Sequence, residues 1–171
     1  ESTKIHSVAG VLKDSDGIVF ARPFRTPHHT ATTVSLAGGG SHVKPGEISL
    51  AHNGVLFLDE LPEFDKTALE ILRQPLEDGE VTVSRVKART NFKARTMLVA
   101  GMNPCPCGYF GDPKHHCTCS EQKIKRYLSR VSGPLLDRFD IHVELPRVKF
   151  EELRSDISAG SSEDIKKRVN D

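Results

Sequence analysis

The segment Gly54-Val55-Leu56-Phe57-Leu58-Asp59-Glu60 decides the fold, because an unbroken apolar run leads directly into two acids. Such a run is typical of a strand buried on both faces of a parallel sheet. Downstream, Asp65 can cap a helix that extends to about Leu76, and Pro75 is expected to kink or shorten this helix. Strands that alternate with helices predict an α/β fold with a parallel-rich sheet.

Further elements are predicted on both sides of this segment. Val81 and Val83 alternate with polar residues, which indicates a half-exposed strand, and Ser120 is a suitable helix cap. The complete prediction comprises a helix end and turn at 4–12, loops with one or two short hairpins at 13–53, strands at 80–86, 92–102 and 139–145, and helices at 120–131 and near 163–169.

Length and composition are those of an ordinary globular protein. The chain has 171 residues, which suits about one domain, with 37% hydrophobic residues, 27% charged residues and a net charge of +1. The sequence has no run of 18 apolar residues and no apolar signal core behind residues 1–4. We therefore expect a cytoplasmic protein with no membrane partner.

Asp59 and Glu60 are the first candidate site residues. Binding sites of open parallel sheets lie at the carboxyl ends of the strands, where these two acids stand. An apolar strand ending in Asp-Glu has the form of a Walker B element. Asp59 would bind Mg²⁺, for which one carboxylate suffices, and Glu60 would orient or deprotonate an attacking water. Considered alone, the two acids fit an ordinary surface strand end equally well.

Asn103 and Arg138 strengthen this interpretation through their order and spacing along the chain. Asn103 follows the strand predicted at 92–102 and is suited to hydrogen-bond a γ-phosphate or the water. Arg138 lies between a short turn and a predicted strand, where an arginine can donate into a neighbouring subunit's site and stabilise charge on a transferring phosphate. Taken singly, Asn103 is a common turn residue and Arg138 a surface partner of a nearby aspartate.

Five longer segments resemble the ATPase module of the magnesium-chelatase-like ComM/YifB family, a relative of the magnesium chelatase ATPase subunit. They are residues 5–10 (IHSVAG), 22–30 (RPFRTPHHT), 45–60 (PGEISLAHNGVLFLDE), 103–108 (NPCPCG) and 132–138 (SGPLLDR). The resemblance covers roughly residues 5–150. It implies an AAA+ P-loop NTPase-type α/β fold, with a parallel-rich sheet, helices on both faces and β-hairpin insertions.

The resemblance also implies roles for the candidate residues. ATP and Mg²⁺ would bind between the subunits of a ring hexamer. Asp59 and Glu60 would be the Walker B residues, Asn103 sensor 1 and Arg138 the arginine finger. ComM proteins are associated with DNA branch migration during natural transformation, which implies a DNA-remodelling motor. Two alternatives stay open: a chelatase-like ATPase that acts on a protein partner, and a non-enzymatic, zinc-stabilised DNA-binding module.

The sequence departs from the family because it lacks a Walker A loop, G-x-x-x-x-G-K-[ST]. The nearest candidate, at 39–45, has the wrong spacing, and Pro45 replaces the hydroxyl residue. Relatives carry this loop just upstream of residues 5–10, and their helical lid follows the arginine finger. We therefore expect an incomplete core with weak or no ATP binding of its own. Its expected parts are an AAA+ core at 1–150, with a helix-2-type insertion at 18–53, a hairpin and sensor strand at 80–102 and a cysteine-rich loop at 103–119, followed by a linker toward the absent lid at 151–171.

The four cysteines form two C-x-C pairs separated by nine residues. In a chain without a secretion signal, this pattern favours a metal site over disulfides. Four thiolates can bind Zn²⁺ tetrahedrally, and a nearby histidine can substitute for one of them. A reduced, metal-free loop is the alternative. The candidate ligands are Cys105, Cys107, Cys117 and Cys119, with His115 and His116 as substitutes.

Residues 85–95 are rich in positive charge and contain no acid. In AAA+ relatives the hairpin before sensor 1 points into the pore of the ring, where basic residues would contact DNA phosphates without sequence preference. A solvated basic turn has nearly equal weight. The residues concerned are Arg85, Lys87, Arg89, Lys93 and Arg95. For the adjacent His28 and His29, packing or capping is favoured over metal binding.

Overall fold

The computed structural model describes residues 1–12, 17–40, 42–85, 88–145 and 160–170. They divide into two compact units, Glu1–Ile141 and His142–Asp171. The second unit contains α9 (Ser162–Asn170), which confirms the helix predicted near 163–169. Within the described ranges, no helix is long and apolar enough to cross a membrane.

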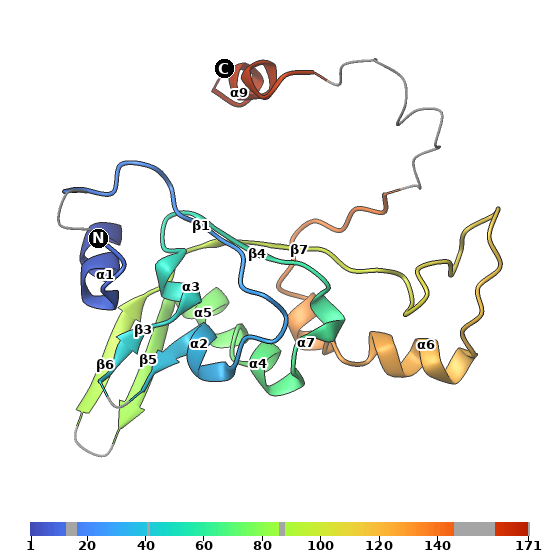
Figure 1. The fold of residues 1–171 in the computed structure, drawn as a ribbon, viewed down its shortest axis with the longest axis horizontal. Coiled ribbons are helices and arrows are strands. Elements are labelled where there is room, and N and C mark those ends of the chain that lie inside the picture. The colour runs from blue at the N-terminus through green and yellow to red at the C-terminus, as the bar shows by residue number, and fades with distance from the viewer. Residues whose placement is uncertain (13–16, 41, 86–87, 146–159, 171) are drawn as a thin grey trace. The chain divides into compact units, whose positions relative to one another are not determined.

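A parallel sheet of three strands forms the centre of the first unit (Figure 1). The strands are β1 (Phe24–Arg25), β4 (Val55–Leu58) and β7 (Met97–Ala100), in the order β1-β4-β7. Leu56 is paired with Leu98, and Leu58 with Ala100. The parallel strand predicted from the apolar run is therefore confirmed, and so is the α/β fold class.

The two faces of this sheet have different environments. Leu56 and Leu58 are fully buried and pack in the main hydrophobic cluster with residues of the following helices, such as Leu69. On the opposite face, Phe24 and Met97 are 61% and 65% exposed. Helices were expected on both faces, but within the described residues the core lies on the face of Leu56 and Leu58.

The helix predicted at 65–76 is divided into shorter elements. A 3₁₀ turn, η1 (Leu61–Glu63), precedes α4 (Lys66–Glu70) and α5 (Arg73–Asp78). Asp65 caps α4 as predicted, since its Oδ1 accepts the N–H of Thr67 at 2.9 Å. Pro75 has no N–H to donate within the helix, and the predicted shortening is confirmed by the break before α5.

The prediction of loops at 13–53 was wrong in several places. The turn predicted near residue 10 is present after α1 (Ser2–Ala9), and one predicted hairpin is formed by β2 (Gly38–Gly39) and β3 (Lys44–Pro45). Residues 13–53 also contain two helices that were not predicted, α2 (Thr33–Ala37) and α3 (Glu47–Leu50). It also supplies β1, which pairs in parallel with β4. Two residues of the supposed insertion at 18–53 therefore belong to the central sheet.

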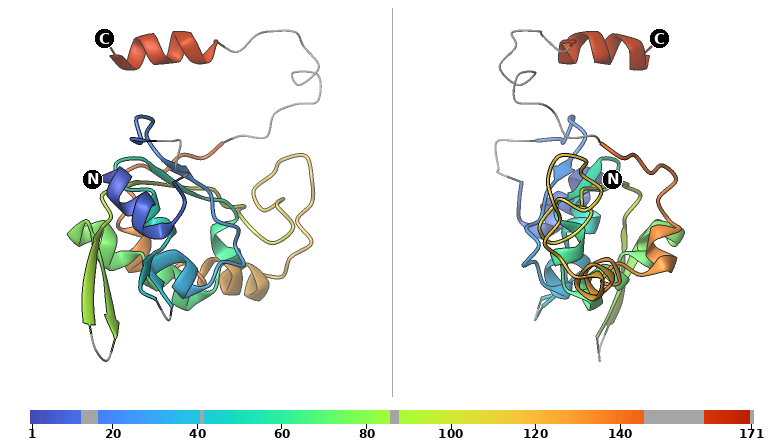
Figure 2. Two further views of the ribbon diagram at one scale, coloured as in Figure 1. Left: turned by 60° about the vertical axis from the view of Figure 1, so that its left-hand side comes forward. Right: turned by 90° about the vertical axis from the view of Figure 1, so that its right-hand side faces the viewer.

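The single strand predicted at 92–102 was also wrong. Residues up to Lys93 belong to β6 (Ala88–Lys93), which forms an antiparallel hairpin with β5 (Glu80–Arg85), and only 97–100 belong to β7. Between them, Arg95 donates its N–H to Nδ1 of His52 at 3.1 Å and accepts the N–H of Asn53 at 2.7 Å. These bonds turn the chain from the hairpin into the sheet. Figure 2 shows the hairpin projecting away from the sheet.

The last helices of this unit are α6 (Glu121–Leu128) and α7 (Gly133–Leu136). Ser120 caps α6 as predicted, because its Oγ accepts the N–H of Lys123. The strand predicted at 139–145 was wrong: this segment belongs to none of the sheets that the described residues form. Its apolar side chains are largely exposed, with Ile141 at 80% and Leu145 at 87%. An alternating pattern becomes a strand only where a neighbour supplies hydrogen bonds.

Candidate functional site

The ends of β4 and β7 bring the predicted acids and Asn103 to the same edge of the sheet. Gly101 donates its N–H to the carbonyl of Leu58 at 2.9 Å, and its own carbonyl accepts the N–H of Leu61 at 2.9 Å. The turn that contains Asp59 and Glu60 is thereby tied to the segment that leads from β7 to Asn103. The carboxyl ends of adjacent parallel strands meet here, as expected for a binding edge.

Asp59 and Glu60 are both exposed, and their turn is fixed locally. Oδ1 of Asp59 accepts the N–H of Glu60 at 2.9 Å. A methyl group at Gly101 would lie only 2.9 Å from the same oxygen, so glycine gives the carboxylate room beside β7. Glu60 has φ 52° and ψ 46°, a left-handed backbone that is uncommon outside glycine. Such strained backbone is concentrated at functional sites.

Tyr127 of α6 connects Asn103 with the acids. Its side chain is buried, and burial raises the pKa of its phenol, as do the nearby carboxylates of Glu63 and Glu60. The backbone of Asn103 hydrogen-bonds the phenol and acts on this pKa in the opposite direction. The Asn103 side chain itself is exposed. The backbone of the predicted sensor is thus held between β7 and α6.

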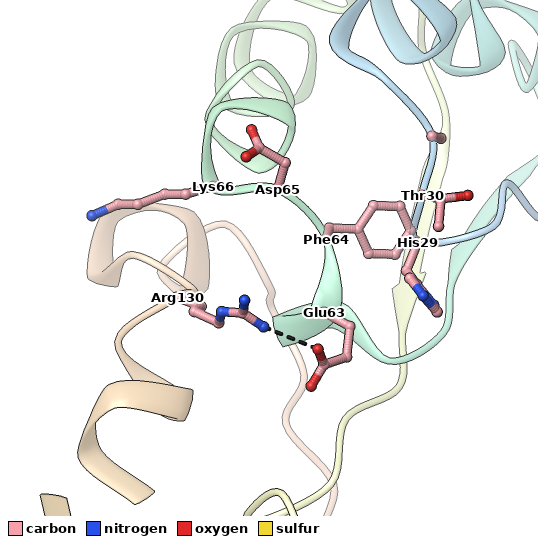
Figure 3. Close-up of a pocket in the computed structure, with 8 residues that line it drawn as sticks. His29, Thr30, Glu63, Phe64, Asp65, Lys66 and Arg130 are labelled. Atoms are coloured by element: carbon pink, nitrogen blue, oxygen red, sulfur yellow. Dashed lines mark hydrogen bonds and ion pairs between the residues drawn. The ribbon is translucent and has the colours of Figure 1, made fainter. Parts of the chain in front are cut away.

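A cleft of about 450 Å³ lies on the side of η1 and α4. Figure 3 shows Arg130 and Glu63 on one side of it and His29 beside Phe64 on the other. Arg130 donates to Glu63 at 3.0 Å and to the carbonyl of Pro62 at 2.9 Å. These bonds attach the segment after α6 to the turn that follows the two acids.

His29 is a neighbour of the acids that the sequence interpretation missed. Its Nδ1 lies 3.2 Å from Oε2 of Glu60. The signal that could have found it is β1: residues just after a third parallel strand reach the same edge of the sheet. β1 was predicted as loop, and for His29 packing or capping was favoured over metal binding, so its contact with Glu60 was not predicted.

Arg138 does not join Asp59, Glu60 and Asn103 in this chain. Its guanidinium forms an ion pair with Glu77 of α5, with Nε donating to Oε1 at 2.8 Å. The structure therefore gives Arg138 a partner within its own subunit. Its predicted role as an arginine finger concerns a neighbouring subunit and stays a prediction.

The four cysteines come together in the loop between β7 and α6. Their four sulfur atoms all lie within 4.8 Å of one another. Cys105 and Cys107 are 3.4 Å apart, and Cys117 lies 3.7 Å and 3.6 Å from them. A tetrahedral Zn²⁺ with Zn–S bonds of about 2.3 Å separates its sulfurs by about 3.8 Å, so the cluster has dimensions that fit the metal.

The surroundings of the cluster favour a thiolate at Cys107, whereas burial and the neighbouring sulfurs raise the pKa values of Cys117 and Cys119. Cys105 is fully buried and accepts the N–H of Phe110 at 3.3 Å. The backbone N–H of Tyr109 lowers the pKa of Cys107 to about 5. His115, a predicted substitute, pairs with Asp112 at 3.1 Å instead, and within the described residues the metal-binding group consists of the four cysteines. The coarse prediction of a metal-binding cluster therefore agrees with the structure.

Of the predicted DNA-contacting residues, Arg85, Arg89 and Lys93 belong to the β5–β6 hairpin. Arg89 is exposed on β6 and stands opposite Ser84. Lys93 forms an ion pair with Glu80 across the hairpin, so part of its charge is neutralised. The side chain of Arg85 and all of Lys87 lie outside the described residues. Arg95 has left the hairpin and lies in the turn before β7.

Comparison with known proteins places this geometry in a family. Residues 1–153 match the family described as magnesium chelatase, subunit ChlI. Competence protein ComM of Haemophilus influenzae is 58% identical over 125 residues, which are 73% of this chain and 24% of ComM. Uncharacterized protein YifB of Escherichia coli is 49% identical over 149 residues, which are 86% of this chain and 29% of YifB.

A more distant relative is DNA replication licensing factor Mcm6 of Drosophila melanogaster, 24% identical over 99 residues, which are 58% of this chain and 11% of Mcm6. The chain spans about a quarter of the length of the ComM and YifB relatives. The family match nevertheless covers most of the chain, including both acids, Asn103, Arg138 and the four cysteines. The chain therefore belongs to the magnesium chelatase ChlI family of AAA+ ATPases and is of the ComM/YifB type.

Proposed function

We propose that this chain carries the water-activating half of an ATP-hydrolysing site in a ring-forming, DNA-remodelling motor. The observation that carries the proposal is that Asp59, Glu60 and Asn103 follow the carboxyl ends of two adjacent parallel strands at one edge of the sheet. Two acids and a neutral hydrogen-bonding side chain at such an edge suit phosphoryl transfer to water.

The residues have distinct proposed roles. Asp59 would hold Mg²⁺, because it presents hard oxygen ligands at an exposed strand end and this ion keeps most of its own water. When bound, Mg²⁺ neutralises charge on the nucleotide phosphates. Glu60 accepts a proton from the attacking water or orients it, and the Asn103 amide contacts that water or the terminal phosphate.

The 171 residues include no phosphate-binding loop, so this activity is proposed for the full-length protein that contains the chain. By itself the chain is expected to bind ATP weakly or not at all. The family and the similarity to Mcm6 support an oligomeric assembly, and we propose a hexamer. Its active sites would form between subunits, with Arg138 donated across the interface.

DNA is the proposed substrate, and the exposed Arg89 on the β5–β6 hairpin supports it. In the full-length protein, ATP hydrolysis should be stimulated by DNA, and Lys87→Glu combined with Arg89→Glu should weaken DNA binding. Losing two phosphate contacts should reduce the slope of log affinity against log salt by about two. Titrations of labelled DNA at several salt concentrations measure both effects.

A charge reversal away from the hairpin serves as the matched control. Lys125→Glu changes an exposed lysine of α6 that pairs with Glu121, and it should leave DNA binding unchanged. If the hairpin variant binds DNA like the wild type, the proposed contact is wrong. Hydrolysis that responds to a protein partner but not to DNA would favour the chelatase-like alternative.

A structural Zn²⁺ is proposed for the cluster of Cys105, Cys107, Cys117 and Cys119, supported by four sulfurs within 4.8 Å of one another, three of which are 3.4 to 3.7 Å apart. The loop begins just after Asn103 and ends at Ser120, the cap of α6. A metal that joins its two halves would hold the sensor and the buried Tyr127 in register.

Elemental analysis of protein purified without chelators should find about one Zn²⁺ per chain. Cys107→Ser should lose most of this metal, because serine is a poor zinc ligand, whereas His115→Ala should retain it. The histidine variant is a suitable control because His115 lies in the same loop but pairs with Asp112. Less than about 0.1 Zn²⁺ per wild-type chain would count against the site.

A further inference from the structure

The imidazole of His29 contacts the carboxylate proposed to act on water. Nδ1 of His29 lies 3.2 Å from Oε2 of Glu60. The two atoms lie within ion-pair distance, and a carboxylate offers only acceptor oxygens, so the contact is favourable when Nδ1 carries a hydrogen. The two side chains are 31% and 51% exposed, which leaves the pair accessible to substrate.

The backbone around His29 forms a closed turn. Ala31 donates its N–H to the carbonyl of His28 at 2.9 Å. Nδ1 of His28 lies 2.9 Å from Oγ1 of Thr30 and accepts the N–H of the same residue at 3.3 Å. This turn follows β1, whose pairing with β4 delivers it to the edge where Glu60 lies.

Two rings restrict the orientation of the His29 imidazole. The His28 ring lies 4.0 Å away, centroid to centroid, and tilted by 35°. Phe64 lies 6.5 Å away in an edge arrangement at 79°, and it is itself 1% exposed in the core. Because the His29 imidazole packs against both rings, its Nδ1 is held close to Glu60. Figure 3 shows His29 and Phe64 side by side.

Within the described residues, the hydrogen bonds that hold Glu60 are made by its backbone. Its N–H bonds to Asp59, and its φ of 52° is set by the turn. A half-exposed glutamate side chain rotates about several bonds and populates several rotamers in water. A misplacement of about 1 Å of a group that acts on the reacting atoms can cost about 10²-fold in rate.

We infer that His29 is a positioning residue that holds the Glu60 carboxylate in the orientation from which it acts on the attacking water. This inference rests on the hydrolytic role proposed for Glu60. His29 engages one carboxylate oxygen and has no proton-transfer role of its own. Its contribution is orientation, so its loss should lower kcat rather than weaken ATP binding.

Steady-state hydrolysis by the full-length protein tests the inference. His29→Ala is expected to lower kcat about 10-fold, with KM for ATP within about twofold of the wild type. His29→Asn should recover a large part of this loss, because the asparagine amide nitrogen occupies the same position along the side chain as Nδ1. His42→Ala, which removes a histidine from the turn between β2 and β3, should leave kcat unchanged.

The double variant His29→Ala with Glu60→Gln separates positioning from general loss of structure. If His29 acts only through Glu60, the double variant should be no slower than Glu60→Gln alone. An unchanged kcat in His29→Ala overturns the inference, and so does a raised one, which would mean that His29 restrains Glu60. A further loss in the double variant also overturns it.

If the hydrolytic role proposed for Glu60 is itself wrong, the measurements give a different result. If Glu60→Gln hydrolyses ATP at the wild-type rate, or if the wild type does not hydrolyse ATP, Glu60 has no hydrolytic role and the inference falls with it.

A spectroscopic test on this chain reports the contact between His29 and Glu60 directly. The imidazole ¹⁵N signals of His29 should indicate the Nδ1–H tautomer and shift in Glu60→Ala, while those of His42 stay in place. Unshifted His29 signals would show that the contact is absent.

Discussion

Glu60→Gln in the full-length protein is expected to lower kcat for ATP hydrolysis by about 10²- to 10⁴-fold while ATP binding persists. Glutamine keeps the size of the side chain and still accepts a hydrogen bond, but it cannot take a proton from water. The left-handed backbone of Glu60 and its N–H bond to Asp59 do not involve the carboxylate, so the turn should be retained. Phosphate release at saturating Mg²⁺ and ATP measures the rate, and a fluorescent ATP analogue measures binding.

Glu63→Gln is the matched control for this prediction. Glu63 lies in the same turn but pairs with Arg130. The two side chains are 42% and 48% exposed, and ion pairs of this kind contribute about 1 kcal/mol or less. Hydrolysis should therefore stay within a few-fold of the wild type. Equal losses in the two variants would mean that the turn, and not the Glu60 carboxylate, supports activity.

The sequence predicted the edge of the sheet where the acids lie better than it predicted the elements around it. The apolar run before Asp59 predicted a buried parallel strand; β4 confirms the parallel pairing, with Leu56 and Leu58 buried and Val55 and Phe57 half-buried. Asp65 and Ser120 were identified as helix caps because capping depends on residues only two or three positions away. The fold class followed from these local signals.

The errors arose where distant contacts decide the backbone. Local pattern alone continued one strand from 92 to 102, but His52 and Asn53 hydrogen-bond Arg95 and divide it. β1 has two residues and is a strand only because β4 lies beside it. The segment at 139–145 has the alternation of a strand but joins no sheet within the described residues. None of these outcomes is encoded in a short window.

The same distinction between local and distant contacts explains why the cysteine cluster was predicted and the contact of His29 was not. The cysteine cluster was predicted because the two C-x-C pairs are separated by only nine residues, in a loop that can fold back on itself. The contact of His29 with Glu60 depends on β1, on the turn after it and on Phe64 from a third segment. It could be found only after the sheet order was known.

Arg138→Ala in the full-length protein is expected to lower kcat by about 10³-fold or more, since an arginine that stabilises transition-state charge from a neighbouring subunit has effects of this size. In this chain the guanidinium pairs with Glu77 and not with Asp59 or Glu60. Arg126→Ala, which removes an exposed arginine of α6, should leave hydrolysis unchanged. Phosphate release measured as for Glu60→Gln checks both variants.

Mixing two inactive variants tests whether Arg138 acts across a subunit interface. In a ring with head-to-tail contacts, each active site would take Glu60 from one subunit and Arg138 from the next. When Glu60→Gln and Arg138→Ala subunits are combined in equal amounts, about a quarter of the interfaces should contain both wild-type residues. Hydrolysis should therefore reappear in the mixture. An inactive mixture, with subunit exchange verified by labelled protomers, would mean that Arg138 acts within its own chain. The ion pair with Glu77 would then be its structural role.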